Sequence, residues 1–419
     1  QANVVSFFFS NHFSFIIILR TTKASSRSLG SLKTLLCISD RYTTRGIGRR
    51  GAQHHLSTLQ RLRRQREKEA TRGRSARNYN SFSPMEGKKQ QTEFKTGVPT
   101  VSSCFDSGNG TFQSLSDDGK VLKVAISDDP YTEVDGRNHK MWFHFKVSNL
   151  EAAKGPVKVV LTNAGDCSYP GGWGGVEAPE GAAPYRACFS TDRRNWLRLE
   201  ATEYVNGELH MTLDASEEPA LSGVDAVWLA YFAPYSQEQY MDLMGSVVTP
   251  SPLTQIRTIG QTLDGADMEM FTVRGEEGEG EKKKSLWFIA RQHPGESMAS
   301  WWMEGFVRRL LDPADPVAAK LLTKADVHVV PMMNPDGARR GYLRTNAAGA
   351  NLNREWKSPT EAYSPEVFHV MREMKAEGLD FCLDVHGDEA LPFNFISGSE
   401  GCPCWSERLA KLQKDWCDT

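Results

Sequence analysis

The pattern of apolar residues changes near residue 247, and this change constrains the fold more than any other feature of the chain. From about residue 100 to 245, short runs of β-branched and aromatic residues alternate with clusters of Gly, Pro, Asn and Asp, as in antiparallel β-proteins. After residue 247, strand-like apolar runs alternate with amphipathic helix-like segments, which indicates a mixed or parallel sheet flanked by helices. The sequence therefore predicts two domains, an all-β sandwich at 100–247 and an α/β domain at 248–419.

Six apolar runs support the sandwich and have the length and spacing of its strands. They lie at 120–127, 141–149, 157–163, 195–202, 208–215 and 226–232. A sandwich of this size has about seven to nine strands. The second domain has expected strands at 267–273, 285–292, 326–333 and 379–385, and expected helices at 297–312, 316–324 and 364–378. The first two of these strands are expected to form a hairpin around the charged loop between them.

Composition bounds the class of protein. With 39% hydrophobic and 24% charged residues and a net charge of −2, the chain is typical of a globular protein and gives no indication of a nucleic-acid partner. The apolar stretch at 4–19 is short for a membrane span. Eight scattered cysteines without a C-x-x-C pair favour reduced thiols in an intracellular compartment.

The first 84 residues differ from the rest in charge. They contain 16 Lys and Arg against 3 Asp and Glu, a net charge of +13, so the remaining residues carry −15 of the total of −2. A Ser- and Arg-rich stretch poor in acids is typical of disordered leaders and organellar transit peptides. We expect 1–84 to be a low-order leader outside the fold, absent from the mature protein or used for targeting, and 85–99 to be a linker.

Polar side chains follow three of the predicted strands of the α/β domain at the points where the strands end. His293 and Glu296 follow the second strand, Asn334 the third and His386 the fourth. Because ligands of such sheets bind beyond the carboxyl ends of the strands, we expect His293, Glu296 and His386 to meet if their strands are neighbours. Two imidazoles and a carboxylate, with a fourth position left to water, are typical of a catalytic zinc site. Residues three apart on a first helical turn would also share a face.

The residues alone leave three questions open. A histidine at a strand end is more often a hydrogen-bonded structural residue than a ligand. The H-x-x-E spacing occurs twice, since His386 and Glu389 repeat it, so spacing does not decide which glutamate binds a metal. Asp384, two residues before His386, is explained as well by a structural role as by a hydrogen bond to a ligand.

Three longer motifs resemble the successive signatures of the zinc carboxypeptidase family. They are RQHPGESMASWWMEGFVRRLLD at 291–312, VVPMMNPDGARRGYLRTNAAGANLNREW at 329–356 and LDVHGDEALPFNF at 383–395. They look most like the cytosolic carboxypeptidases, which also carry a β-sandwich before the catalytic domain, and CFSTDRRNWLRL and VWLAYFAPYSQEQY resemble that sandwich. The resemblance covers about 100–419, and it implies that His293, Glu296 and His386 bind one Zn²⁺ per chain.

The same resemblance assigns roles in substrate binding and catalysis. Arg344, in GYLRTN, corresponds to the arginine that polarises the scissile carbonyl and stabilises the oxyanion. Asn353 and Arg354, in LNR, correspond to the residues that hold the terminal carboxylate of the substrate. The residue types suit these roles, because a guanidinium grips a carboxylate through two parallel hydrogen bonds.

The sequence departs from the tubulin-directed members of the family in ways that bear on the substrate. HGDE stands in place of an HGHS-like run, and LNREW in place of LNRNW. Glu389 matches no role that the family requires. We expect the general-base glutamate and the specificity pocket to lie beyond Thr419, in a part of the α/β domain that this sequence does not include.

The function predicted is that of a zinc metallocarboxypeptidase that removes the C-terminal residue, glutamate being one candidate, from peptides or protein tails. Two alternatives stay open: a zinc amidohydrolase acting on small N-acyl amino acids, and an inactive truncated binding module. The expected partner is a peptide or protein tail, an acidic tail like that of tubulin being one candidate, with no nucleic acid or membrane. The expected location is the cytoplasm, with organellar targeting by 1–84 left open.

Overall fold

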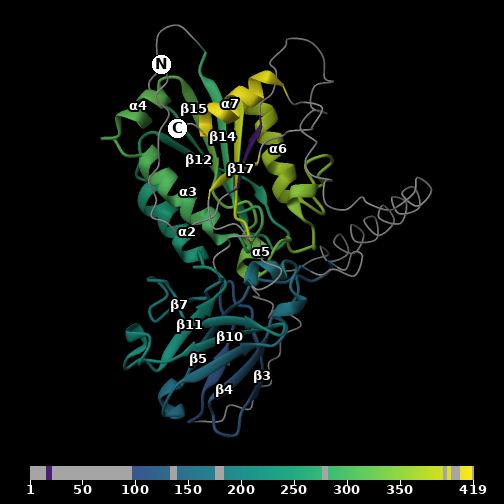
Figure 1. The fold of residues 1–419 in the computed structure, drawn as a ribbon. Coiled ribbons are helices and arrows are strands. Elements are labelled where there is room, and N and C mark those ends of the chain that lie inside the picture. The colour runs from purple at the N-terminus through teal and green to yellow at the C-terminus, as the bar shows by residue number, and fades with distance from the viewer. Residues whose placement is uncertain are drawn as a thin grey trace, which may run out of the picture.

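The chain folds into a β-sandwich and a larger domain built on a sheet with helices on both sides (Figure 1). The computed structural model describes residues 16–20, 97–132, 139–174, 184–275, 282–389, 394–397 and 406–417. The mixed α/β architecture after a β-rich domain is the fold class predicted from the sequence.

The sandwich consists of two five-stranded sheets within the described residues. One has the order β3-β4-β6-β10-β9 and the other the order β2-β5-β11-β7-β8. The strands are β2 (Thr100–Ser102), β3 (Thr111–Leu115), β4 (Val121–Ala125), β5 (His144–Ser148), β6 (Val157–Leu161), β7 (Cys188–Ser190), β8 (Leu197–Arg198), β9 (Thr202–Val205), β10 (Glu208–Leu213) and β11 (Ala226–Ala230). The expected number was about seven to nine. It was too low because β2, β3 and β7 are too short or too polar to give a strand-like run.

The larger domain has a seven-stranded mixed sheet of order β12-β13-β15-β14-β16-β1-β17. Its strands are β12 (Thr254–Gln261), β13 (Asp267–Val273), β14 (Lys284–Ala290), β15 (Ala325–Val330), β16 (Phe381–His386), β1 (Ile16–Arg20) and β17 (Phe395–Ser397). β14 runs parallel to both β15 and β16, whereas β13 is antiparallel to β12 and β15.

The hairpin expected between 267–273 and 285–292 does not form. β15 lies between β13 and β14 and pairs with both. The hairpin of this region is instead β12–β13. β12 was missed because Ile256 and Ile259 are its only large apolar residues and lie three apart, so the segment lacks the two-residue period of a strand.

Helices cover both faces of this sheet. The α-helices of the described residues are α2 (Gln237–Leu243), α3 (Ser297–Leu310), α4 (Pro316–Leu322), α5 (Pro335–Arg340), α6 (Pro365–Glu377) and α7 (Glu407–Cys417). In Figure 1, α3 and α6 lie on opposite sides of the sheet. Successive side chains of β14 point to opposite faces of the sheet. Phe288 packs in the apolar cluster that contains α3, whereas Trp287 and Ile289 pack in the cluster that contains α6.

Part of the basic leader contributes a strand. We expected residues 1–84 to lie outside the fold, but Ile16–Arg20 form β1, which pairs antiparallel with β16 and parallel with β17. The run IIILR has the β-branched residues that favour strands, and it covers the edge that β16 would otherwise present. The expectation is therefore wrong for these five residues, and the rest of 1–84 lies outside the described residues.

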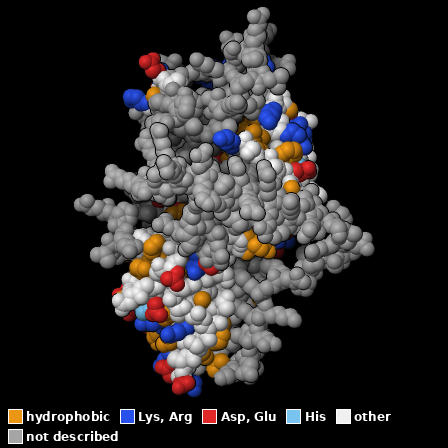
Figure 2. All heavy atoms as spheres, turned by 90° about the vertical axis from the view of Figure 1, so that its right-hand side faces the viewer, with side chains coloured by type: hydrophobic (Ala, Val, Ile, Leu, Met, Phe, Trp, Pro, Cys, Tyr) orange, Lys and Arg blue, Asp and Glu red, His pale blue; other side chains and the backbone are white. Residues whose placement is uncertain are grey.

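Three other features bear on partners and location. The four cysteines described as free are Cys104, Cys167, Cys188 and Cys382, and Cys402 and Cys404 lie outside the described residues. On the face of the sandwich shown in Figure 2, acidic and basic side chains are interspersed. Among the described residues, none of the helices has the length and apolar character needed to cross a membrane.

Candidate metal centre

The three strands that are followed by the polar residues singled out in the sequence are neighbours. β15, β14 and β16 lie side by side and parallel, so their carboxyl ends meet at one edge of the sheet, where α5 lies close to the sandwich (Figure 1). His386 is the last residue of β16. Asn334 does not join it. The Oδ1 of Asn334 accepts a hydrogen bond from N of Gly337, and its Nδ2 donates to the carbonyl of Gln292.

A tight turn, not a helical face, brings His293 and Glu296 together. α3 begins at Ser297, with Glu296 as its N-cap residue, and N of Glu296 donates to the carbonyl of His293 over 3.2 Å. The turn is held by Arg291, which has a φ of 61° and donates from Nε to the carbonyl of Pro294 over 2.6 Å. The expectation of a shared helical turn is therefore wrong in its geometry, although the two side chains do meet.

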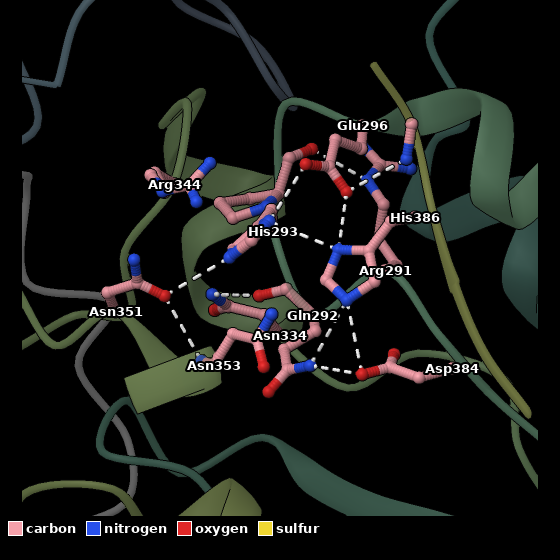
Figure 3. A network of polar contacts seen from close by, with 12 residues as sticks. Arg291, Gln292, His293, Glu296, Asn334, Arg344, Asn351, Asn353, Asp384 and His386 are labelled. Atoms are coloured by element: carbon pink, nitrogen blue, oxygen red, sulfur yellow. Dashed lines mark hydrogen bonds and ion pairs between the residues drawn. The ribbon is translucent and has the colours of Figure 1, made fainter. Parts of the chain in front are cut away.

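The side chains of His293, Glu296 and His386 converge on one point, as Figure 3 shows. One Oε of Glu296 lies 2.8 Å from Nδ1 of His293, and the other lies 2.9 Å from Nδ1 of His386. The two Nδ1 atoms are 3.1 Å apart. All three residues are buried, and one potential ligand atom from each lies within 4.8 Å of the others. The geometry is that of three donors that could hold one metal ion.

The outer sides of both rings face hydrogen-bond acceptors. Nε2 of His386 lies 3.1 Å from Oδ2 of Asp384, and Nε2 of His293 lies 3.1 Å from Oδ1 of Asn351 (Figure 3). These contacts are satisfied when both rings carry their proton on Nε2, which leaves both Nδ1 lone pairs facing the shared point. Two lone pairs 3.1 Å apart repel each other unless a cation, either a proton or a metal ion, lies between them. Two imidazoles and a carboxylate are ligands that suit Zn²⁺.

The electrostatics of this point also favour positive charge. Burial lowers the pKa of His386, but the carboxylates of Asp384 and Glu296 outweigh it and raise that pKa to about 10. Burial and the Arg344 guanidinium lower the pKa of His293 to about 4. The site thus holds one more carboxylate than it can balance with a single imidazolium.

The substrate-binding residues expected from the sequence lie around this point. Arg344 follows α5, and none of the described residues hydrogen-bonds its guanidinium. Asn353 and Arg354 lie in a 3₁₀ turn, where N of Asn353 donates to Oδ1 of Asn351 over 3.1 Å. Oδ1 of Asn353 is buried without a hydrogen-bond partner among the described residues, and Arg354 is exposed.

Several neighbours of the site were not predicted. Asn351 could have been found from the sequence, since it lies two residues before Asn353. Tyr169 and His139 could not, because they belong to the sandwich. Burial raises the pKa of Tyr169 although the charge of Arg344 lowers it, whereas burial and Arg344 together lower the pKa of His139 to about 4. Burial, and then Glu296, raise the pKa of the half-buried Glu389 to about 8.

Two family models match consecutive parts of the chain. Residues 101–232 match the cytosolic carboxypeptidase N-terminal domain, and residues 238–391 match the zinc carboxypeptidase domain. The two matched ranges meet between 232 and 238, whereas the sequence pattern had suggested a boundary near 247.

Curated relatives match the chain over both domains. An uncharacterised protein of Zymomonas mobilis is 42% identical over 312 residues, which cover 74% of this chain and 73% of that protein. Mouse cytosolic carboxypeptidase 6 is 25% identical over 324 residues, which cover 73% of this chain. The match spans 56% of that mouse protein and 26% of human cytosolic carboxypeptidase 4.

Solved structures share the fold. A metallo-carboxypeptidase of Burkholderia cenocepacia has a TM-score of 0.67 at 35% identity, covering 77% of this chain and 79% of that one. A second metallo-carboxypeptidase, from Pseudomonas aeruginosa, was solved in complex with (2-guanidinoethylmercapto)succinic acid. It has a TM-score of 0.67 at 38% identity, and the match covers 76% of this chain and 78% of the Pseudomonas chain. The chain thus belongs to the zinc carboxypeptidase family of peptide-bond hydrolases and carries the N-terminal domain of the cytosolic carboxypeptidases.

Proposed function

We propose that this protein is a zinc metallocarboxypeptidase that removes the C-terminal residue of a peptide or protein tail. The observation that carries the proposal is the convergence of three donor atoms from His293, Glu296 and His386, within 4.8 Å of one another. These residues would hold one Zn²⁺ per chain. A zinc ion there would lower the pKa of a bound water and polarise the scissile carbonyl.

The protein's own residues would orient the substrate and balance its charge. Arg344, whose guanidinium has no hydrogen-bond partner among the described residues, would donate to the carbonyl oxygen as negative charge develops on it. Asn353 and the exposed Arg354 would hold the terminal carboxylate, which restricts cleavage to the end of a chain. Water would add to the carbonyl carbon, the C–N bond would break, and the leaving amine would gain the proton.

The substrate class follows from the relatives. The Pseudomonas metallo-carboxypeptidase binds a succinic acid that also carries a guanidino group, so a substrate end with more than one charged group fits such a site. We propose peptides with a charged C-terminal residue as substrates, with acidic tails such as that of tubulin among them. The names of the cytosolic carboxypeptidase relatives support a cytoplasmic location.

The test is cleavage of a panel of N-acetylated peptides that end in glutamate, lysine or phenylalanine, each compared with its C-terminal amide. The full-length protein should release the last residue of at least one free acid and of none of the amides, as followed by mass spectrometry. A chelator should abolish the activity and Zn²⁺ should restore it. Hydrolysis of N-acyl amino acids with no cleavage of peptides would favour the amidohydrolase alternative.

A further inference from the structure

A carboxylate of the sandwich binds the backbone of the segment that carries Arg344. Asp129, in the loop after β4, is 3% exposed. Its Oδ1 accepts a hydrogen bond from N of Leu343 over 2.7 Å. Its Oδ2 accepts from N of Arg344 over 2.8 Å, and from N and Oγ1 of Thr345 over 2.9 and 3.0 Å. One side chain of the sandwich therefore receives three successive amides of the catalytic domain.

Asp129 is itself fixed within the sandwich. Its N donates to the carbonyl of His139 over 2.8 Å, and its carbonyl accepts from Oγ1 of Thr132 over 2.7 Å. Three consecutive amides that point at one anion form a rigid cradle. The backbone on either side of this contact therefore has little freedom to rotate.

The other side of the same segment is attached to the metal-binding turn. N of Gly295 donates to the carbonyl of Leu343 over 2.8 Å, and Gly295 lies between His293 and Glu296. The peptide groups around Arg344 are thus held between Asp129 and the turn that supplies two candidate ligands. Because none of the described residues hydrogen-bonds the guanidinium of Arg344, the direction of that side chain depends on its backbone.

We propose that Asp129 is a positioning residue for peptide hydrolysis, which acts by fixing the backbone of Arg344, and that the sandwich thereby completes the active site. This inference rests on the proposed function of Arg344. It assigns the N-terminal domain a direct part in catalysis, because an error of about 1 Å in a charge-stabilising group costs up to about a hundredfold in rate.

The cost of burying Asp129 is consistent with a role beyond joining two domains. Burial raises the pKa of this carboxyl to about 6, against the amides of Leu343, Arg344 and Thr345, which lower it. An apolar contact would join the domains without that cost. What the carboxylate adds is a fixed direction for three amides.

The test is a double-mutant cycle of Asp129→Asn and Arg344→Gln in the full-length protein, with an N-acetylated peptide cleaved by the wild type as the probe. Asp129→Asn places an NH₂ group against amide donors and should lower kcat at least tenfold, with little change in KM or in zinc content. In the Arg344→Gln background, Asp129→Asn should lower kcat by less than twofold, because the residue through which it acts is already gone.

Asn163→Ala is the matched control. Asn163 bonds N and O of Ile126 from within the sandwich, over 3.0 and 2.9 Å, so its removal loosens the same loop without a direct contact to the catalytic domain. It should lower Tm and leave kcat within twofold. If Asp129→Asn does not fold, Thr345→Val takes its place, because it removes only one of the four hydrogen bonds to the Asp129 carboxylate. Thr345→Val should give a several-fold loss of kcat, and this loss should disappear in the Arg344→Gln background.

Three results would overturn the inference, and they differ from one another. A kcat within twofold of wild type in Asp129→Asn, or in Thr345→Val if that variant has to be used, makes the contact purely structural. Losses that multiply in the double mutant mean that Asp129 acts independently of Arg344. A wild-type protein that cleaves no peptide, or full activity in Arg344→Gln, removes the proposed function on which the inference rests.

Discussion

Oδ2 of Asp384 lies 3.1 Å from Nε2 of His386, on the side of the ring opposite to the Nδ1 that faces Glu296. Nε2 of Gln292 donates to the same carboxylate oxygen over 2.7 Å, so Asp384 is held in place. This contact selects the tautomer of His386 that can bind a metal through Nδ1. Of the two interpretations of Asp384 left open by the sequence, the geometry favours the hydrogen bond to a ligand.

Asp384→Asn should weaken zinc binding about 10–100-fold, because an amide no longer stabilises the proton on Nε2 of His386. Competition with a fluorescent zinc chelator would measure the change. Asp380→Asn is the control. Asp380 lies just before β16, away from the site, and accepts a hydrogen bond from N of Ser285 in β14. Equal zinc affinity in Asp384→Asn and wild type would contradict the assignment.

Arg344 and Arg354 should affect different kinetic constants. Arg344→Gln should lower kcat about 10²–10³-fold, because it removes a donor to charge that develops only in the transition state. Arg354→Ala should raise KM for a peptide acid with a smaller effect on kcat, because it removes a contact made before the reaction. Steady-state kinetics on one peptide would separate the two, and the same change in both variants would refute the division of roles.

Gly295→Ala should reduce stability by about 1–3 kcal/mol, because the added methyl group has no room. A Cβ at Gly295 would lie 2.9 Å from the carbonyl oxygen of Leu343 and 2.9 Å from its Cδ1. Gly245→Ala is the control, since a Cβ there meets nothing within 4 Å. Thermal unfolding followed by circular dichroism would test this, and equal Tm values for the two variants would be the contrary result.

The sequence was sufficient to predict the strands that end at the site but not their order. β14, β15 and β16 are continuous apolar runs, and His293 and His386 follow from the positions where two of them end. Sheet order depends on long-range pairing, which is why 267–273 and 285–292 were wrongly paired as a hairpin. Periodicity gives no information on which strand will insert between two others.

The contacts between the domains could not be predicted from the sequence. Asp129 and Leu343 are separated by 214 residues, and nothing in the run SDDPYT around Asp129 indicates that its carboxylate binds distant amides. The contact of Asn351 with His293 was within reach, because Asn351 belongs to the motif at 329–356 that also contains Asn353. His139 and Tyr169 are recognised only once the sandwich is placed against the catalytic domain.

Glu366→Gln should stabilise the protein near neutral pH. Burial, and then Asp336, raise the pKa of Glu366 from 4.5 to about 8. Between these values the folded protein keeps a proton that the unfolded chain releases, so this group's contribution to stability falls as pH rises to about 8 and is constant above it. The gain in the variant is at most about 5 kcal/mol at pH 8, from a difference of about 3.5 pKa units at about 1.4 kcal/mol per unit.

Denaturant unfolding at pH 5 and pH 8 would measure this effect. The difference in stability between Glu366→Gln and wild type should be small at pH 5 and larger at pH 8. The exposed Glu361 offers the control, and Glu361→Gln should give no such pH dependence. A Glu366→Gln variant less stable than wild type at pH 8 would show that the carboxyl is needed in its charged form.

The most direct measurement of the central claim is the zinc content of the purified full-length protein and of His293→Ala, by atomic emission after dialysis against metal-free buffer. The account predicts close to one zinc ion per wild-type chain and less than about a tenth of that in the variant, because two remaining protein ligands hold zinc weakly. Equal, stoichiometric zinc in both proteins would contradict the ligand assignment and the carboxypeptidase mechanism built on it.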